Sequence, residues 1–285
     1  MAILTSVAMF TADKLLDRLH DDWDFLLDSG AFTNFKKGKD VVTLDRYAAL
    51  LREHGHRFYR YFNLDVIGNH PASMERLAEL QSHGLDPVPV FQRGGTTSDL
   101  EDLLGEHRLV GIGGIAGMLQ RTGDRDYLHQ VMRSVGKRRD QIHLLGCGRV
   151  DVLDTYRPKS ADASTYSAVG MYGRLSLWNG KRFISFDKTT ATRGQPGRST
   201  SMRPDGERTA ILRRYDLTWS DLTDESQWVR REGGYGKVLM TSARSWIRYN
   251  IYLQRRGVTL FLVDNPQVTC EELAEAWERE KVLAA

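Results

Sequence analysis

Short apolar runs alternate with amphipathic stretches through residues 1–170, and this alternation constrains the fold more than any other feature of the chain. The runs that resemble β-strands are residues 3–9, 25–27, 58–66, 87–91, 109–112 and 142–145. The stretches with helical spacing of apolar side chains are residues 44–54, 73–83, 99–104 and 127–135, with Ser73 as an expected N-cap. Repeated strand–loop–helix units predict an α/β fold with a parallel sheet and crossover helices.

Polar residues and glycines follow the ends of these strands. They are Asp28-Ser29-Gly30, Asp65, Gln92, Gly113-Gly114, Gly146-Cys147-Gly148 and Asp162. A (β/α)8 barrel gathers the carboxyl ends of all its strands around one pocket, whereas an open sheet gathers them only near its switch point. The sequence therefore predicts a (β/α)8, TIM-like barrel.

The pattern changes after about residue 170. Residues 175–178 and 182–186 flank Asn179-Gly180, which is a strong hairpin signal. Residues 189–207 are rich in Gly, Pro, Ser, Thr and Arg, as loops are. The later elements are a helix over 243–256, a strand over 259–263 and a charged amphipathic helix over 270–283.

We expect one barrel domain over residues 1–285, divided by pattern into three parts. Residues 1–170 supply the core strand–helix units. Residues 171–256 form a basic insertion and part of the last barrel unit, and residues 257–285 add the last strand and the C-terminal helix.

Basic residues are concentrated in one part of the chain. The whole sequence has 40 Lys+Arg and 37 Asp+Glu, a formal net charge of +3. Residues 171–256 alone carry 17 Lys+Arg and 8 Asp+Glu. Such asymmetry indicates a surface for a polyanion, with a merely solvated face as the alternative.

The two cysteines, Cys147 and Cys270, are too few for a disulfide framework or a four-cysteine zinc site. We therefore expect a reducing, cytoplasmic compartment, no metal and no cofactor. No apolar run approaches the roughly 20 residues of a membrane span, and the first residues lack the basic flank of a signal peptide. No membrane partner is expected.

Two carboxylates stand out as candidate catalytic groups. Asp28 follows an apolar run, and Asp162 stands among the small residues 160–165. Two acids at the mouth of one barrel can serve as a nucleophile at an anomeric carbon and as a general acid/base. Each aspartate taken singly could instead cap a helix or a turn.

Two weaker motifs point elsewhere. Residues 111–116 match the glycine pattern of dinucleotide sites, but they follow several earlier strand units and lack the acidic residue about 20 positions further on. His54 and His56 have no accompanying metal-ligand motif. Both patterns are more typical of structural residues.

Taken in order, the strand-end motifs resemble those of the tRNA-guanine transglycosylase superfamily, and most closely its DNA-directed relatives, the phage and bacterial 7-deazaguanine insertases. The matching segments, within residues 1–170, are residues 28–32, 63–65, 91–92, 112–117, 145–148 and the segment around Asp162.

The resemblance implies base exchange. Asp162 would attack C1′ of a target guanosine and hold a covalent glycosyl intermediate, while Asp28 would carry protons to the leaving base and from the incoming one. Asp65 and Gln92 would bind the pyrimidine edge. The other residues implied to contact the base are Ser29, the backbone donors Gly113 and Gly114, and the flanking side chains Phe32 and Leu145.

Departures from the superfamily favour DNA over tRNA. The tRNA-directed members carry a C-x-C-x-x-C and His zinc site after the nucleophile, whereas this chain has only Cys270 in that region. An appended RNA-binding module is also missing. The incoming base would be 7-cyano-7-deazaguanine or a derivative. Phosphate contacts are expected from Arg174, Arg193, Arg198, Arg203 and Arg208.

Three alternatives stay open from the sequence: a tRNA-guanine transglycosylase, a non-catalytic nucleic-acid-binding barrel and a barrel hydrolase or N-glycosidase. The expected location is the cytoplasm, or the host cytoplasm for a phage protein. The sequence leaves the oligomeric state open.

Overall fold

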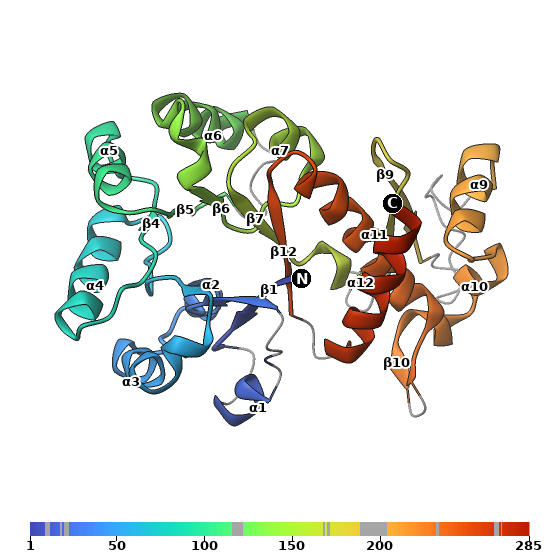
Figure 1. The fold of residues 1–285 in the computed structure, drawn as a ribbon, viewed down its shortest axis with the longest axis horizontal. Helices are drawn as coiled ribbons and strands as arrows, with labels where there is room; N and C mark the ends of the chain where they lie inside the picture. Colours follow the sequence, from blue (N-terminus) through green and yellow to red (C-terminus); the bar gives the residue numbers. More distant parts are fainter. Residues whose placement is uncertain are drawn as a thin grey trace. The chain divides into compact units, whose positions relative to one another are not determined.

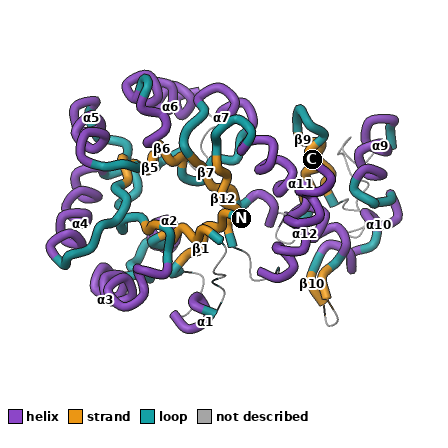
Figure 2. Tube along the Cα trace, in the orientation of Figure 1, coloured by secondary structure: helices purple, strands orange, loops and turns teal. Residues whose placement is uncertain are grey.

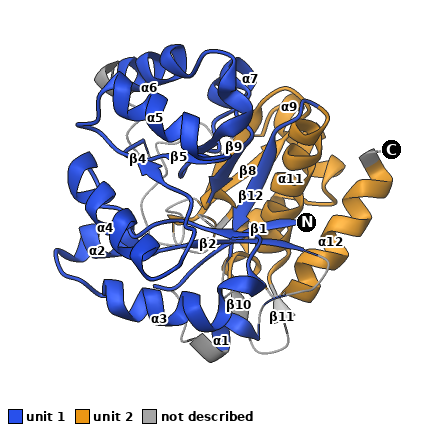
Figure 3. Cartoon of the chain, turned by 60° about the vertical axis from the view of Figure 1, so that its left-hand side comes forward, with its two compact units in different colours: residues 1–163, 256–264 blue, residues 164–255, 265–285 orange. Residues whose placement is uncertain are grey.

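The computed structural model describes residues 1–8, 12–17, 19, 23–115, 122–167, 169, 172–188, 204–231, 234–264, 268 and 270–284. The chain forms two compact units. Unit 1 comprises residues 1–163 and 256–264, and unit 2 comprises residues 164–255 and 265–285 (Figure 3). The predicted basic insertion, residues 171–256, thus corresponds closely to the first segment of unit 2.

Unit 1 is built on a parallel sheet of eight strands. They are β1 (Ala2–Ser6), β2 (Asp24–Asp28), β3 (Arg60–Tyr61), β4 (Val90–Phe91), β5 (Val110–Ile112), β6 (Ile142–Leu144), β7 (Ser160–Ala163) and β12 (Thr259–Val263). Their order is β3-β2-β1-β12-β7-β6-β5-β4, and the sheet is curled (Figure 2). The α/β class and the parallel sheet are therefore as predicted.

The two edges of this sheet are also connected. Phe62, directly after β3, forms a parallel bridge with Val88, just before β4. The Asn63 N–H donates to Val88 O at 3.0 Å, and the Val88 N–H donates to Tyr61 O at 2.8 Å. The Asn63 side chain adds a hydrogen bond, since its Oδ1 accepts the Val90 N–H at 2.9 Å.

Helices lie around the outside of the curled sheet (Figure 1). They are α1 (Ala12–Leu16), α2 (Ala31–Lys37), α3 (Leu44–His54), α4 (His70–Ser82), α5 (Thr97–Glu106), α6 (Thr122–Val135) and α7 (Val150–Tyr156), with 3-10 turns at Gly55–Arg57 and Arg138–Gln141. Local chemistry sets their starts. Thr43 caps α3, and a reciprocal capping box of Thr96 and Asp99 begins α5.

Side chains from several strands fill the interior of unit 1. One buried cluster joins Ala2, Leu4, Leu26, Phe62, Val88, Val90 and Phe261. Because these residues come from strands distributed around the sheet, its concave face is a packed core. Polar groups that serve a ligand must therefore lie at an end of the strands, beyond this core.

In unit 2, a 3-10 turn (Thr165–Ser167) precedes the predicted hairpin. Strands β8 (Arg174–Trp178) and β9 (Phe183–Asp187) pair in antiparallel register, with Trp178 opposite Phe183. The loop thus has four residues, and Asn179 Oδ1 accepts the N–H groups of Lys181 and Arg182 at 2.9 Å each. Gly180 adopts φ +103°, a conformation that favours glycine.

The remaining elements of unit 2 surround a long buried helix. They are α9 (Gly206–Arg214), α10 (Trp219–Thr223), a 3-10 turn (Glu225–Trp228), β10 (Arg230–Arg231), β11 (Gly234–Tyr235), α11 (Lys237–Gln254) and α12 (Cys270–Ala284). Trp246 of α11 stacks on Phe183 with ring centroids 4.5 Å apart, and Tyr249 packs on Trp178 at 4.7 Å. In the described ranges, no helix is long and apolar enough to cross a bilayer.

The start of α11 generates a stability prediction. A Cβ on Gly236 would lie 2.2 Å from the Gln227 carbonyl oxygen, so Gly236→Ala forces the backbone apart. We expect a loss of about 3 kcal/mol in the free energy of unfolding, measured by urea titration. The matched control is Gly206→Ala at the start of α9, where nothing lies within 4 Å; it should stabilise by up to about 1 kcal/mol. Equal effects of the two variants would contradict the packing argument.

Candidate active site at the carboxyl ends of the strands

Asp28 ends β2, and two neighbours orient its carboxylate. The Ser6 hydroxyl, at the end of β1, donates to Asp28 Oδ2 at 2.8 Å, and the Gly30 N–H donates to the same oxygen at 3.1 Å. Oδ1 is left for a ligand, as far as the described residues extend. Burial raises the pKa of Asp28, the Ser6 hydrogen bond opposes this, and the charge of Asp162 raises it further. The environment thus favours a carboxyl group that can carry a proton.

Asp162 lies in β7 and is held by one oxygen in the same way. His143 Nε2 contacts Asp162 Oδ1 at 3.2 Å, and the Gly146 N–H donates to that oxygen at 2.8 Å. Within the described part of the chain, Oδ2 accepts no hydrogen bond. Asp162 is 6% exposed, so its second oxygen is an oriented, largely desolvated carboxylate oxygen. Such an atom suits a nucleophile.

His143 is fully buried and links Asp162 to the sheet. Its Nδ1 lies 2.9 Å from Ser160 Oγ. With the proton on Nε2, the ring donates to Asp162 and accepts from the Ser160 hydroxyl, which satisfies both nitrogens. The rings of Phe62 and Phe261 flank it at centroid distances of 5.0 and 6.0 Å. His143 is therefore a positioning residue for Asp162.

Asp65 is a further carboxylate of this region and is buried; it lies three residues beyond the Phe62 bridge. The Gln92 amide Nε2 donates to Asp65 Oδ2 in a short hydrogen bond, and Gln92 Oε1 accepts the Gly68 N–H at 3.2 Å. These two contacts determine which way the amide points. Burial and then the charge of Asp28 raise the pKa of Asp65 to about 7, although the Gln92 hydrogen bond lowers it.

Charge interactions link Asp28 to each of the other two carboxylates. Asp28 raises the pKa of Asp65, and Asp162 raises the pKa of Asp28. All three lie in unit 1, at or just beyond the carboxyl ends of β2, β3 and β7. The structure thus brings together the predicted catalytic pair and one predicted base-binding acid.

The remaining predicted base-binding residues also lie in unit 1. Ser29 is buried, and its Oγ has no hydrogen-bond partner among the described residues, so a ligand could supply one. A Cβ on Gly113 would lie 2.1 Å from Gln92 Nε2, which explains the glycine. The Gly113 N–H, however, donates to Phe91 O at 2.9 Å, so it is not available as the expected donor to a base. That role falls to Gly114 (φ +69°) alone.

The two predicted flanking side chains differ in exposure. Leu145 is partly buried against the core cluster, whereas Phe32 on α2 is 48% exposed. Cys147 lies between glycines near Asp162, but burial raises its pKa to about 11, so it remains a neutral thiol at neutral pH. The thiol is thus poorly suited to be the nucleophile.

The predicted phosphate-binding arginines do not form one described cluster. Arg174 pairs with Asp187 at 3.0 Å, and Arg208 pairs with Asp205. Arg208 lies in α9, and Asp205 caps that helix by accepting the Arg208 N–H. Arg193, Arg198 and Arg203 lie outside the described residues.

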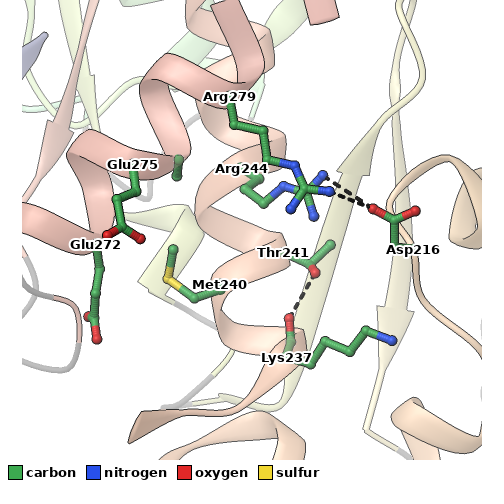
Figure 4. Close-up of a pocket in the computed structure, with 9 residues that line it drawn as sticks. Asp216, Lys237, Met240, Thr241, Arg244, Glu272, Glu275 and Arg279 are labelled. Atoms are coloured by element: carbon green, nitrogen blue, oxygen red, sulfur yellow. Dashed lines mark hydrogen bonds and ion pairs between the residues drawn. The ribbon is translucent and has the colours of Figure 1, made fainter.

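A pocket of 330 Å³ lies in unit 2 (Figure 4). It is lined by Asp216, Lys237, Met240, Thr241, Arg244, Glu272, Glu275, Ala276 and Arg279. Its cations are engaged by carboxylates of the same unit: Arg279 contacts Asp216 at 2.8 Å, Arg244 contacts Glu280 at 2.7 Å, and Lys237 contacts Asp221 at 3.1 Å. The pocket is therefore poorly suited to a phosphate group.

Sequence reasoning missed three residues of the site, namely Ser6, His143 and Ser160. His143 is a polar side chain between apolar neighbours in a buried strand, whereas Ser6 follows Thr5 and Ser160 follows Lys159. A lone polar residue in a buried strand requires a partner, and this was the signal that could have identified His143.

Comparison of the sequence with protein-family models and with curated proteins finds no match. The assignment of chemistry to this site therefore rests on its residues and their geometry.

The pKa of Asp65 generates a prediction about pH. The folded pKa of about 7 exceeds the unfolded value near 4, so the folded state binds more protons between these values and stability falls as pH rises through that window. Asp65→Asn removes this titration. Its stability relative to the parent should rise by up to about 4 kcal/mol between pH 4 and pH 8, measured by urea unfolding. If the free energies of unfolding of Asp65→Asn and the parent changed with pH in parallel, the raised pKa of Asp65 would be contradicted.

Proposed function

We propose that the protein is a DNA-guanine transglycosylase, which exchanges guanine in DNA for a 7-deazaguanine base through a covalent intermediate on Asp162. The observation that carries this proposal is the coupled set of Asp28, Asp65 and Asp162, in which the two catalytic acids are each anchored through a single oxygen. Glycosidic exchange requires this division between a nucleophile and an acid/base.

The first half-reaction breaks the bond to guanine. Asp162 Oδ2 attacks C1′, the C1′–N9 bond breaks, and its electron pair leaves with guanine while Asp28 donates a proton to the base. The hydrogen bonds from His143 and Gly146 hold Oδ1, so the attacking oxygen need not reorient. Reaching C1′ in a polynucleotide requires the target nucleotide to leave its stack.

The second half-reaction restores the enzyme. Asp28, now a carboxylate, accepts the N9 proton of the incoming 7-deazaguanine base. N9 attacks C1′, and the bond between C1′ and Asp162 breaks, which returns the carboxylate. Because Asp28 has a raised pKa, it is a better proton carrier at neutral pH than an ordinary aspartate.

The guanine edge suits the other polar groups. It offers an exocyclic amino donor and a carbonyl acceptor. Asp65 would accept from the donors, and the Gly114 N–H would donate to the carbonyl. Gln92 orients Asp65, and the Ser29 hydroxyl supplies a further polar contact. 7-Deazaguanine shares this edge, so one pocket can serve both the leaving and the incoming base.

The fold that we propose for unit 1 is a closed (β/α)8 barrel. Strands that follow one another in unit 1 are neighbours in the sheet, and the Phe62–Val88 bridge joins β3 to β4. In sequence, the first segment of unit 2, residues 164–255, then lies between β7 and β12, the seventh and eighth strands of the barrel. DNA is favoured over tRNA because the sequence lacks the cysteines for the zinc site of tRNA-directed members.

Incubation with labelled 7-cyano-7-deazaguanine and duplex DNA, followed by digestion to nucleosides, tests the proposal. We expect a labelled deoxynucleoside and release of one guanine for each base inserted. Activity on tRNA alone would instead support tRNA exchange. Guanine release without insertion would indicate an N-glycosidase, and DNA binding without release a non-catalytic barrel; each outcome overturns the proposal.

Two near-isosteric variants separate the catalytic roles. Asp162→Asn should lower exchange by at least about 10³-fold and abolish the covalent DNA adduct seen on denaturing gels, because the attacking oxygen is lost. Asp28→Asn should lower turnover by about 10²- to 10⁴-fold, the usual size of a proton-transfer contribution. Full activity of Asp162→Asn would refute its assignment as nucleophile.

A further inference from the structure

Helix α2 presents two aromatic rings to solvent. Phe32 is 48% exposed and Phe35 is 55% exposed, while Ala31 and Asn34 form the buried side of the helix. The Asn34 side chain ties the helix to the turn that follows: its amide donates to Val42 O at 2.8 Å, and its Oδ1 accepts the Val42 N–H at 3.0 Å. Two half-exposed rings on an anchored helix form a candidate binding surface.

Three lysines accompany these rings. Lys36, Lys37 and Lys39 are exposed, and no acidic side chain of the described residues forms an ion pair with them. Lys36 Nζ lies 5.8 Å from the centre of the Phe32 ring. Cations in the last turn of a helix also favour its dipole, but the dipole does not account for exposed rings.

The contrast with unit 2 is informative. Although the sequence places most of the excess positive charge there, several of its described cations contact acids, among them Arg174, Arg182, Lys188, Arg208 and Lys237. Such pairs must separate or be shared before they can neutralise a phosphate. The lysines of α2 and of the residues after it have no ion pair with a described acid, so no such pair must separate before they contact a phosphate.

We infer that the α2 surface, defined as Phe32, Phe35, Lys36, Lys37 and Lys39, binds the single-stranded segment of nucleic acid next to the target nucleotide. The rings would stack on bases and the lysines would contact phosphates, the combination that holds single strands. Helix α2 begins three residues after Asp28, so this surface adjoins the candidate active site. The choice of DNA as ligand rests on the proposed function.

The dimensions agree with this assignment. A helix of seven residues is about 10 Å long, so it can contact only a short segment of one strand. The positive charge beside the rings favours a polyanion over an apolar protein partner. A nucleotide that leaves the stack for attack at C1′ leaves its neighbours available to the rings.

Fluorescence anisotropy with a labelled single-stranded DNA dodecamer, without any 7-deazaguanine base, tests the surface independently of exchange. The charge variant combines Lys36→Ala, Lys37→Ala and Lys39→Ala, and the ring variant is Phe35→Ala. The matched controls are combined Lys137→Ala, Arg138→Ala and Arg139→Ala, just before β6, and Tyr59→Ala, a 49% exposed ring just before β3. Both controls lie toward the amino ends of the strands.

We expect the charge variant to weaken binding at least tenfold in low salt. It should also reduce the slope of log K against log salt by about 2, since each contacted phosphate contributes about 0.7. Phe35→Ala should weaken binding about tenfold with little change in slope. The controls should stay within about twofold of the parent, and all variants should keep its melting temperature.

Equal weakening by the charge variant and its control would overturn the proposal, because generic charge would then explain binding. Unchanged binding in both α2 variants would also overturn it, as would loss of self-association in place of DNA binding, which would assign the surface to a second copy of the chain. If DNA binds through α2 but no exchange occurs, the proposed function fails and the surface stands. If exchange proceeds and the α2 variants bind DNA normally, the proposed function stands and only the proposal about the α2 surface fails.

Discussion

Electrostatic repulsion among three carboxylates is the main physical constraint on the candidate site of unit 1. Asp65 and Asp162 are buried, Asp28 is partly buried, and Asp28 interacts with each of the other two. Buried carboxylates that repel one another cost stability unless hydrogen bonds or protonation compensate. The donors around them, from Ser6, Gly30, Gln92, His143 and Gly146, supply part of that compensation. Their raised pKa values show that the compensation is incomplete for Asp28 and Asp65.

Incomplete compensation is a feature of catalytic sites. Fully satisfied carboxylates would be stable but inert, because every lone pair would already have a partner. Here the donors to Asp28 and Asp162 converge on one oxygen of each group, and the other oxygen accepts no hydrogen bond from the described residues, which agrees with the proposed roles of the two acids. Two roles then follow from two environments. Asp28 is shifted toward the protonated form, and Asp162 has two donors that support its charge.

Much of the fold could be predicted because its signals are local. The strand 259–263 appears with the predicted bounds, since a β-branched and aromatic run is bounded by Gly257 and Asp264.

The predicted start of α4 was wrong for an equally local reason. Ser73 was the expected cap, but Asn69 caps the helix with Pro71 in its first turn, and the buried Ser73 hydroxyl bonds to Asn69 O. Both residue types can cap, and only the backbone path decides between them. Likewise, the strand predicted over residues 58–66 is shorter in the structure, which has a two-residue strand and one bridge there. The Asp65 N–H donates a hydrogen bond to Asn63 O, and this turn ends the extended segment.

The acids of the candidate site could be singled out from the sequence, whereas the residues that orient them could not. Asp28 stood out because it follows an apolar run and Asp162 because it stands among small residues, whereas Ser6 and His143 act through contacts across strands that only the register creates. Exposure was also beyond sequence reasoning, which assigned Phe32 to a base pocket without showing that its ring is half open to solvent.

The chain path through β7 and β12 has a consequence for folding. These two strands pair side by side, with Asp162 opposite Phe261, yet residues 164–255 separate them in sequence. The entropic cost of closing a loop grows with its length. Pairing of β7 with β12 is therefore slow as long as the segment between them is unordered. If unit 2 collapses first, the effective loop shortens. The acid that we propose as nucleophile would then gain its neighbouring strand only after much of unit 2 has formed.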